Sequence, residues 1–212
     1  MTIKKFYSSS FAPNPLRINF MLKIKGVELE FEDINIREGE QKTPEFLAIN
    51  PDGTVPVLVL EDDTTLCDTI GILHYIEKTY PAKPLMGTDT LEQAKILSMM
   101  HKIYTSGSLA VAEAVRNGYL PGFEGRALPG PVAIEQIPEL VGRGQKRVAL
   151  FYQSMNNLLQ GNDFLVNNQL SQADIDLFVC CNFANFIEQP FDAQDHTNLA
   201  KHFNTISTLI KT

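Results

Sequence analysis

The pattern of apolar residues changes once along this 212-residue chain, at Pro81, and that change constrains the fold more than any other feature. Before Pro81, runs that alternate between apolar and polar residues stand between runs of helical spacing, which predicts a mixed α/β region. After Pro81, the patterned runs all have helical spacing. The sequence therefore predicts two domains of different class, each with its own core, and the chain is long enough for both.

The first region is expected to have the order strand, helix, strand, connection, strand, strand, helix. Residues 3–7 and 28–35 alternate in the manner of strands, and the helix between them should end at Gly26, a residue typical of helix ends. Residues 55–60 and 64–67 predict a hairpin. A last helix should run from Asp68 to Tyr80, where Pro81 ends it.

The second region is expected to be all helical. Residues 81–88 contain Pro84 and Gly87 without periodicity, so we place a linker there, between a domain over residues 1–80 and a domain over 89–212. Long helices are expected over residues 91–117, 138–160 and 196–211. One more should begin at Ser171, because Asp174 follows three residues later, as in a capping box.

Charge and cysteine content argue against several classes of function. A formal net charge of −7 and a pI near 5.1 argue against nucleic acid and anionic membranes as partners. No apolar run approaches the roughly 20 residues of a membrane span, and the first residues do not resemble a signal peptide. The three cysteines predict reduced thiols in a cytoplasmic protein. No metal-ligand spacing is present, so we expect no metal.

The segment Asn-Pro-Asp-Gly-Thr-Val-Pro-Val-Leu at residues 50–58 predicts, together with Asp68 and Thr69, a site for a small peptide that carries a carboxylate. Pro56 stands where a strand begins. Because proline has no N–H, it cannot donate a hydrogen bond to a neighbouring strand, so main chain beside it is left unpaired. Asp68 and Thr69 stand at a helix N-terminus, whose free amides and dipole favour an anion. Two alternatives stay open. In the first, Pro56 is an ordinary proline at the start of a strand; in the second, Asp68 only caps its helix.

Five segments in this order and spacing resemble the glutathione transferase family over essentially the full chain. They are Glu-Gly-Glu-Gln-Lys at 38–42, Pro-Glu-Phe-Leu-Ala-Ile-Asn-Pro at 44–51, Gly-x-Val-Pro-x-Leu at 53–58, Asp-Thr-x-x-Ile at 68–72 and the capping box at 171–174. The chain looks most like the cytosolic type and its bacterial theta- or nu-like branch. The resemblance implies an α/β thioredoxin-like N-terminal domain, an all-α C-terminal domain, a homodimer, and glutathione as co-substrate.

The resemblance also implies the residues that bind glutathione: Gln41, Lys42, Thr54, Val55, Pro56, Asp68 and Thr69. The bond before Pro56 should be cis, with the Val55 main chain facing an extended peptide. Asp68 should accept from the ligand's ammonium group, while Thr69 and the first helix amides hold the γ-glutamyl carboxylate. Gln41 and Lys42 correspond to positions that hold the glycyl carboxylate. For Lys42 the alternative is a solvated surface charge.

The sequence departs from the family pattern where the sulfur of glutathione should bind. Relatives place a serine, tyrosine or cysteine near the start of the first helix, but Ala12 occupies the matching position here. Stabilising the thiolate then falls to the Asn14 side-chain amide, to Ser10 or to the main-chain amides that open the helix, with Asn14 and Ser10 expected as the catalytic residues. The alternatives are that Asn14 caps the helix and that Ser10 is a solvated loop residue. Without a cysteine at position 12, no mixed disulfide through the enzyme's own sulfur is expected.

The expected function is that of a detoxifying transferase, which stabilises the thiolate of glutathione and adds it to a small electrophile. A mildly apolar wall for this acceptor is expected from Phe11, Tyr104, Ser108, Val111 and Tyr119. The alternative is that the Tyr-Ser-Val stripe on the second domain's first helix is core. Two other functions stay open, a glutathione-dependent disulfide or peroxide reductase and a non-catalytic interaction module of the same fold. Isomerisation of a cis-dienone, as in the zeta-like branch, also stays open, although the serine pair expected for it at residues 12 and 13 is absent.

Overall fold

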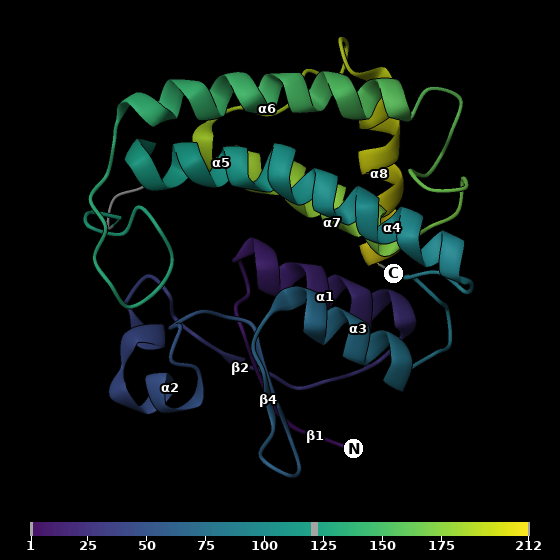
Figure 1. Ribbon diagram of the computed structural model, residues 1–212. Coiled ribbons are helices and arrows are strands. Elements are labelled where there is room, and N and C mark those ends of the chain that lie inside the picture. Colours follow the sequence, from purple (N-terminus) through teal and green to yellow (C-terminus); the bar gives the residue numbers. More distant parts are fainter. Residues whose placement is uncertain (1, 120–122, 212) are drawn as a thin grey trace. The chain divides into compact units, whose positions relative to one another are not determined.

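The computed structural model describes residues 2–119 and 123–211, and these form two compact units (Figure 1). Unit 1 contains the chain up to Lys83 together with Leu128–Ile134. Unit 2 contains the remaining described residues from Pro84 onward. Both units have fully buried apolar side chains of their own, such as Leu58 in unit 1 and Met155 in unit 2.

Unit 1 is a small mixed sheet with helices. Its strands are β1 (Ile3–Ser8), β2 (Glu32–Asp33), β3 (Val57–Leu60) and β4 (Thr65–Leu66), in the order β2-β1-β3-β4. β2 is parallel to β1, whereas β3 is antiparallel to β1 and to β4. The helices are α1 (Pro13–Lys25), α2 (Pro44–Ile49) and α3 (Thr69–Thr79), with a short 3₁₀ turn, η1 (Glu40–Lys42), before α2. The predicted order of elements is therefore confirmed.

One strand is much shorter than its sequence pattern indicates. The alternation over residues 28–35 predicted a strand of eight residues, but only Glu32 and Asp33 pair, opposite Tyr7 and Ser8 at the end of β1. β2 is the edge strand, and it pairs only with the last two residues of β1. Residues 28–31, which precede β2, therefore have no partner in the sheet. By contrast, Gly26 ends α1 as predicted, in a left-handed conformation with φ of 69°.

A buried ion pair connects α1 to α3, which lie side by side (Figure 1). The Nζ of Lys25 lies 2.7 Å from Oε2 of Glu77, and both side chains are almost completely buried. The same ammonium donates to the carbonyl oxygens of Tyr80 at 2.9 Å and Lys83 at 3.1 Å. All of these acceptors lie at the end of α3 or just beyond it, so one cation fixes the C-terminal part of both helices.

The segment Leu128–Ile134 belongs to unit 1, although its neighbours in the chain belong to unit 2. It contacts the turn before β3 through main chain. A Cβ placed on Gly53 would lie 3.8 Å from the amide nitrogen of Pro131, and one placed on Gly130 would lie 3.8 Å from the carbonyl oxygen of Asp52. Both glycines have positive φ. This packing was not foreseen from the sequence.

Unit 2 is built from helices. They are α4 (Thr90–Ile103), η2 (Tyr104–Ser108), α5 (Leu109–Ala114), η3 (Val115–Tyr119), α6 (Glu139–Leu158), α7 (Gln172–Phe183), η4 (Ala184–Ile187) and α8 (Thr197–Lys211). The first four follow one another without a break, η2 and η3 being π-helical turns, and this confirms the helix predicted over residues 91–117. A Cβ on Gly107 would lie 2.7 Å from Cys180 Sγ and from Phe151 Cζ, so only glycine fits where these helices meet.

The capping box at the start of α7 is present as predicted. The Asp174 carboxylate accepts from the main-chain N–H and from the hydroxyl of Ser171, each at 2.9 Å. Its other oxygen accepts from the Leu165 N–H and lies 2.9 Å from Nε2 of His202. Asp174 is completely buried, and both of its oxygens have partners.

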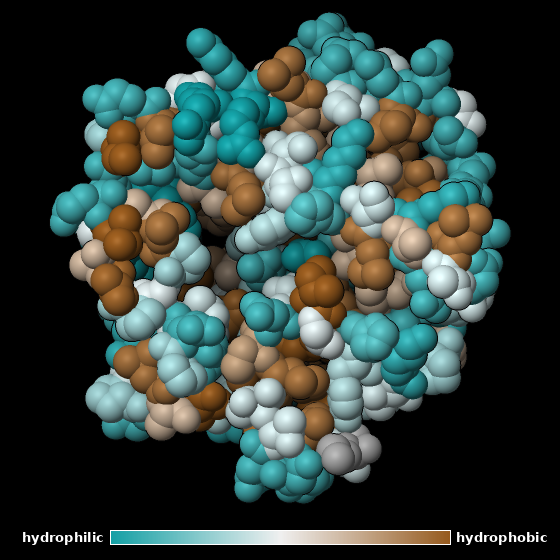
Figure 2. Space-filling view, in the orientation of Figure 1, coloured by the Kyte–Doolittle hydropathy of each residue, from teal (hydrophilic) through white to brown (hydrophobic). Residues whose placement is uncertain are grey.

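Within the described ranges, none of the helices is long and apolar enough to cross a membrane. Exposed apolar side chains occur in separate groups among hydrophilic ones on the face shown in Figure 2.

Candidate functional site

The turn before β3 presents unpaired main chain at Val55. The Val55–Pro56 peptide bond is cis, as the resemblance implies. None of the hydrogen bonds among residues 2–119 and 123–211 involves the Val55 amide or carbonyl. The turn itself is held from inside by Asn50, whose Nδ2 donates to the carbonyl oxygen of Thr54 at 2.8 Å and to its hydroxyl at 3.1 Å. A rigid turn therefore carries a peptide group that is free to pair with a ligand.

The start of α3 has polar groups that the protein does not use. Asp68 occupies the N-cap position, but its side chain makes no capping hydrogen bond and is exposed. The alternative in which Asp68 only caps its helix is therefore wrong for this structure. Thr69 is the first residue of the helix and is 8% exposed, and the first turn contains no acidic residue. The free amides of this turn are available to an anion.

The turn η1 brings Gln41 close to the Val55 segment. A Cβ on Gly53 would lie 3.2 Å from the Gln41 carbonyl oxygen. The Gln41 side chain is 6% exposed, its Nε2 donates to Ile36 at 3.4 Å, and its Oε1 is buried without a partner among the described residues. Lys42 is partly buried and has no ion pair within the described part of the chain. Both residues therefore keep polar groups for a ligand.

One apolar cluster lies beneath all three segments. Tyr7, Ile34, Phe46 and Val57 form its buried part, and Ile36, Val55 and Cys67 pack against it. Ile36 precedes η1 in the chain, Val55 belongs to the turn before β3, and Cys67 directly precedes Asp68 at the start of α3. The structure therefore gathers the predicted glutathione-binding segments of unit 1 around a single support.

Burial raises the pKa of the Cys67 thiol, with Asp52 and Asp68 adding smaller contributions in the same direction. A raised thiol pKa keeps the sulfur protonated at neutral pH, which makes it a poor nucleophile. Cys67 also packs against the apolar cluster, so its role here is packing.

The two candidates for holding the sulfur have different surroundings. α1 begins at Pro13 with Ala12 as N-cap, so Asn14 is the second helical residue and does not cap the helix. Its Oδ1 accepts from Arg17 Nη1 at 3.4 Å, while its amide nitrogen has no partner among the described residues. The Ser10 hydroxyl donates to Asp33 at 2.7 Å, and the Ser10 N–H donates to the same carboxylate at 2.9 Å. Asn14 therefore has a free donor, whereas the Ser10 proton is already engaged.

Arg37 is a residue of this region that the sequence did not single out. Its guanidinium carbon lies 5.0 Å from the centre of the Phe11 ring, so the cation stacks on the aromatic face. Phe11 is partly buried and directly precedes Ala12. No sequence signal identifies this pair, because the contact joins the start of α1 to the loop before η1.

The other acceptor-wall residues lie in unit 2. Tyr104 is 40% exposed and Ser108 is partly buried, both in η2. Val111 in α5 is completely buried, which favours the alternative that it is core. The side chain of Tyr119 lies outside the described residues. The acceptor wall stays a prediction.

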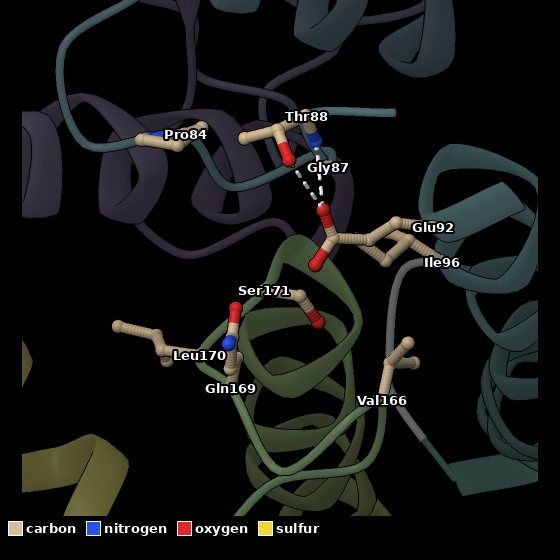
Figure 3. Close-up of a pocket in the computed structure, with 9 residues that line it drawn as sticks. All are labelled: Pro84, Gly87, Thr88, Glu92, Ile96, Val166, Gln169, Leu170 and Ser171. Carbon is tan, nitrogen blue, oxygen red and sulfur yellow. Dashed lines mark hydrogen bonds between the residues drawn. The ribbon is translucent and has the colours of Figure 1, made fainter. Parts of the chain in front are cut away.

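Two cavities in unit 2 do not involve the predicted site residues. One, of about 40 Å³, lies where the segment before α4 meets the start of α7. In it the Glu92 carboxylate accepts from the N–H and hydroxyl of Thr88, while Ser171 stands on the opposite side (Figure 3). It has room only for a few water molecules. The other is an open groove of about 440 Å³ along α4, lined by Lys95, Lys102 and Leu165 among others. Among the described residues, no group of three or more metal-binding side chains is found.

Comparisons with known proteins point in one direction. Residues 11–79 match the family model described as "Glutathione S-transferase, N-terminal domain", and residues 144–211 match "Glutathione S-transferase, C-terminal domain". A zeta-class glutathione S-transferase of Euphorbia esula is 40% identical over 90 residues, which is 42% of this chain and 40% of the relative's length. Glutathione S-transferase 2 of Saccharomyces cerevisiae is 29% identical over 185 residues, covering 86% of this chain and 76% of that protein.

A solved structure extends the likeness to the whole fold. The crystal structure of a glutathione S-transferase domain-containing protein from Marinobacter aquaeolei has a TM-score of 0.84 and 28% sequence identity. The match covers 98% of this chain and 100% of the other.

Proposed function

We propose a function from the premise that this chain belongs to the glutathione S-transferase family, with the family's thioredoxin-like N-terminal and helical C-terminal parts. The protein binds glutathione on unit 1, lowers the pKa of its thiol and adds the sulfur to an electrophilic small molecule. The S–C bond forms as the leaving group departs, and the thiol proton passes to solvent.

The observation that carries this proposal is the set of unused polar groups around Val55. An extended tripeptide can pair with the Val55 amide and carbonyl as an added strand. Its γ-glutamyl carboxylate then meets the amides and the Thr69 hydroxyl at the start of α3, and Asp68 accepts from its ammonium group. At the other end, the glycyl carboxylate meets the ammonium of Lys42 and the second N–H of Gln41 Nε2, whose first N–H donates to Ile36. Each charged part of glutathione has a complementary group that has no other partner among the described residues.

Asn14 is the better candidate for stabilising the thiolate. A thiol has an ordinary pKa of about 8.5, and one charge-assisted hydrogen bond contributes about 1.5–3 kcal/mol, enough to lower the pKa by one to two units. The free amide nitrogen of Asn14 is such a donor, and the start of α1 adds its dipole. The Ser10 hydroxyl would first have to leave Asp33.

Disulfide reduction is the second candidate, because it uses the same thiolate with a different acceptor. The absence of an enzyme sulfur at Ala12 favours a route in which glutathione itself attacks the substrate disulfide. The raised pKa of the Cys67 thiol supports the same route. A homodimer and a cytoplasmic location stay predictions.

Calorimetric titration with glutathione and with S-methylglutathione tests the binding step. Both should bind to the wild type, because the proposed contacts involve the peptide and its charges rather than the sulfur hydrogen. Turnover should then be followed with an aryl chloride and with a mixed disulfide. Absence of glutathione binding would overturn the proposal, and binding without either turnover would leave the interaction module as the better description.

A further inference from the structure

We propose that Arg37, stacked on Phe11, is a specificity-determining residue that selects electrophiles carrying a carboxylate. This inference rests on the proposed function, because it places the electrophile beside the sulfur of bound glutathione. It adds the chemical class of the second substrate, which neither the fold nor the family matches assign.

The pair lies at the start of α1. Phe11 is the residue before Ala12, the N-cap of α1, and Ala12 stands where the sulfur of glutathione is expected. A side chain at position 11 therefore adjoins the reacting centre. Because the Arg37 guanidinium lies 5.0 Å from the centre of the Phe11 ring, the cation adjoins the same centre.

The Arg37 cation is not neutralised by any of the described residues. Within the described residues, no carboxylate forms an ion pair or hydrogen bond with Arg37. Of the acids closest to Arg37 in the chain, Asp33 accepts from Ser10 and Glu40 accepts from the Asn35 N–H at 2.7 Å. The carboxylate of the exposed Glu38 makes no ion pair with the guanidinium among the described residues. The Phe11 ring is the partner that fixes the guanidinium.

The stacked Arg37 guanidinium can bind a carboxylate through its N–H donors. A guanidinium lying on a ring keeps its N–H donors at its edge, where a carboxylate can accept two parallel hydrogen bonds. Stacking also restricts the side chain before the ligand arrives, which lowers the entropic cost of binding.

The surroundings of Arg37 do not form a positive surface, because Asp33, Glu38 and Glu40 lie within four residues of it in the chain. Selection of a carboxylate therefore depends on the fixed guanidinium and its N–H donors rather than on the summed local charge.

The experiment compares two acceptors that differ in one charge, 4-chloro-3,5-dinitrobenzoate and its methyl ester. In both, the glutathione sulfur forms the S–C bond and chloride leaves with the bonding electrons. For Arg37→Ala, kcat/KM with the carboxylate should fall about tenfold, while the value with the ester changes less than about twofold. The KM for glutathione should stay unchanged.

Two further variants and one control sharpen the result. Phe11→Leu removes the ring that positions the cation, so it should cause a similar selective loss, and the double variant should lose no more than either single variant. Arg37→Lys keeps the charge without the planar fork and should fall between wild type and Arg37→Ala. Lys23→Ala removes an exposed charge at the far end of α1 and should affect neither acceptor. Raising salt to about 1 M should reduce the preference for the carboxylate.

The outcomes separate this inference from the proposed function. Equal losses with both acceptors would overturn the role in selecting a carboxylate, as would no loss with either. Wild-type protein that turns over neither acceptor, and does not bind glutathione, would overturn the proposed function and this inference with it.

Discussion

Two helices of this protein begin with similar residues and use them in opposite ways. At the start of α7, Ser171 and Asp174 satisfy one another, and the carboxylate also serves Leu165 and His202. At the start of α3, the Asp68 side chain makes no capping hydrogen bond and the first amides have no partner in the described part of the chain. A helix start rich in Ser, Thr and Asp therefore stabilises the fold when its side chains and amides hydrogen-bond within the protein. When they do not, the same groups are available to a ligand.

Removing Asp174 is the largest test of this comparison. Asp174→Ala would leave the Leu165 and Ser171 amides and His202 without their acceptor in a buried site, so we expect unfolding to become easier by about 3–5 kcal/mol. Asp68→Ala should cost less than about 0.5 kcal/mol, since no capping bond is lost. Urea unfolding followed by circular dichroism measures both variants. Similar costs at the two positions would contradict the distinction.

Asp68 should show its effect in ligand binding instead. Asp68→Asn removes a charged acceptor for the ligand's ammonium, worth about 1.5–3 kcal/mol, so the Kd for glutathione should rise at least about tenfold. Calorimetry measures the change, with Glu28→Gln, an exposed acid of the same unit, as the matched control. Unchanged affinity in Asp68→Asn would mean that the open helix start does not hold the glutamyl end.

The start of α1 provides a third helix N-terminus, and Asn14 tests how it is used. Asn14→Ala should raise the pKa of bound glutathione by about one unit, because one hydrogen bond to the thiolate is lost. The rate should then fall about tenfold at pH 6.5 and recover as the pH rises above the new pKa. Ser10→Ala is the control and should change the rate less than twofold. A larger effect of Ser10→Ala would show that its hydroxyl leaves Asp33 for the sulfur.

Cys67 should give the smallest effect, although it precedes the open helix start. Burial raises the pKa of its thiol, so the reactive thiolate is scarce at neutral pH and increases as the pH rises toward that raised pKa. Cys67→Ser should keep full turnover with aryl chlorides and with disulfides. Alkylation by iodoacetamide should be slow at pH 7 and speed up with pH. Loss of disulfide turnover in Cys67→Ser would reinstate an enzyme sulfur in the mechanism.

Features that depend on neighbours in sequence were predictable. Gly26 ends α1, and Ser171 with Asp174 forms the box, because each signal involves residues within one helical turn. The strand over residues 28–35 was overpredicted, since alternation shows which residues could pair but not how much of β1 is available to them. Asn14 was considered a cap because Pro15 follows it, but Pro13 starts the helix two residues earlier.

The candidate site divides in the same way. Val55, Pro56, Asp68 and Thr69 were predicted as site residues because a family motif marks them, and the structure adds that the Val55 peptide group and the Asp68 carboxylate have no partner among the described residues. The stacking of Arg37 on Phe11 and the bond from Ser10 to Asp33 join segments distant in sequence, and no local pattern encodes them. Whether a donor is free or engaged is thus a property of the folded unit, and here it favours Asn14 over Ser10.

The buried ammonium of Lys25 can report local opening of unit 1 between α1 and α3. An amine-reactive reagent such as formaldehyde with borohydride will methylate exposed lysines such as Lys23 at once, but it reaches Lys25 only in molecules whose α1–α3 corner has opened. The ratio of label at these two neighbouring positions, read by mass spectrometry, therefore counts opening events at this corner without any engineered probe. Following that ratio while glutathione is added would show whether the ligand suppresses local opening at the C-terminal ends of α1 and α3, the two helices whose N-termini are proposed to bind it.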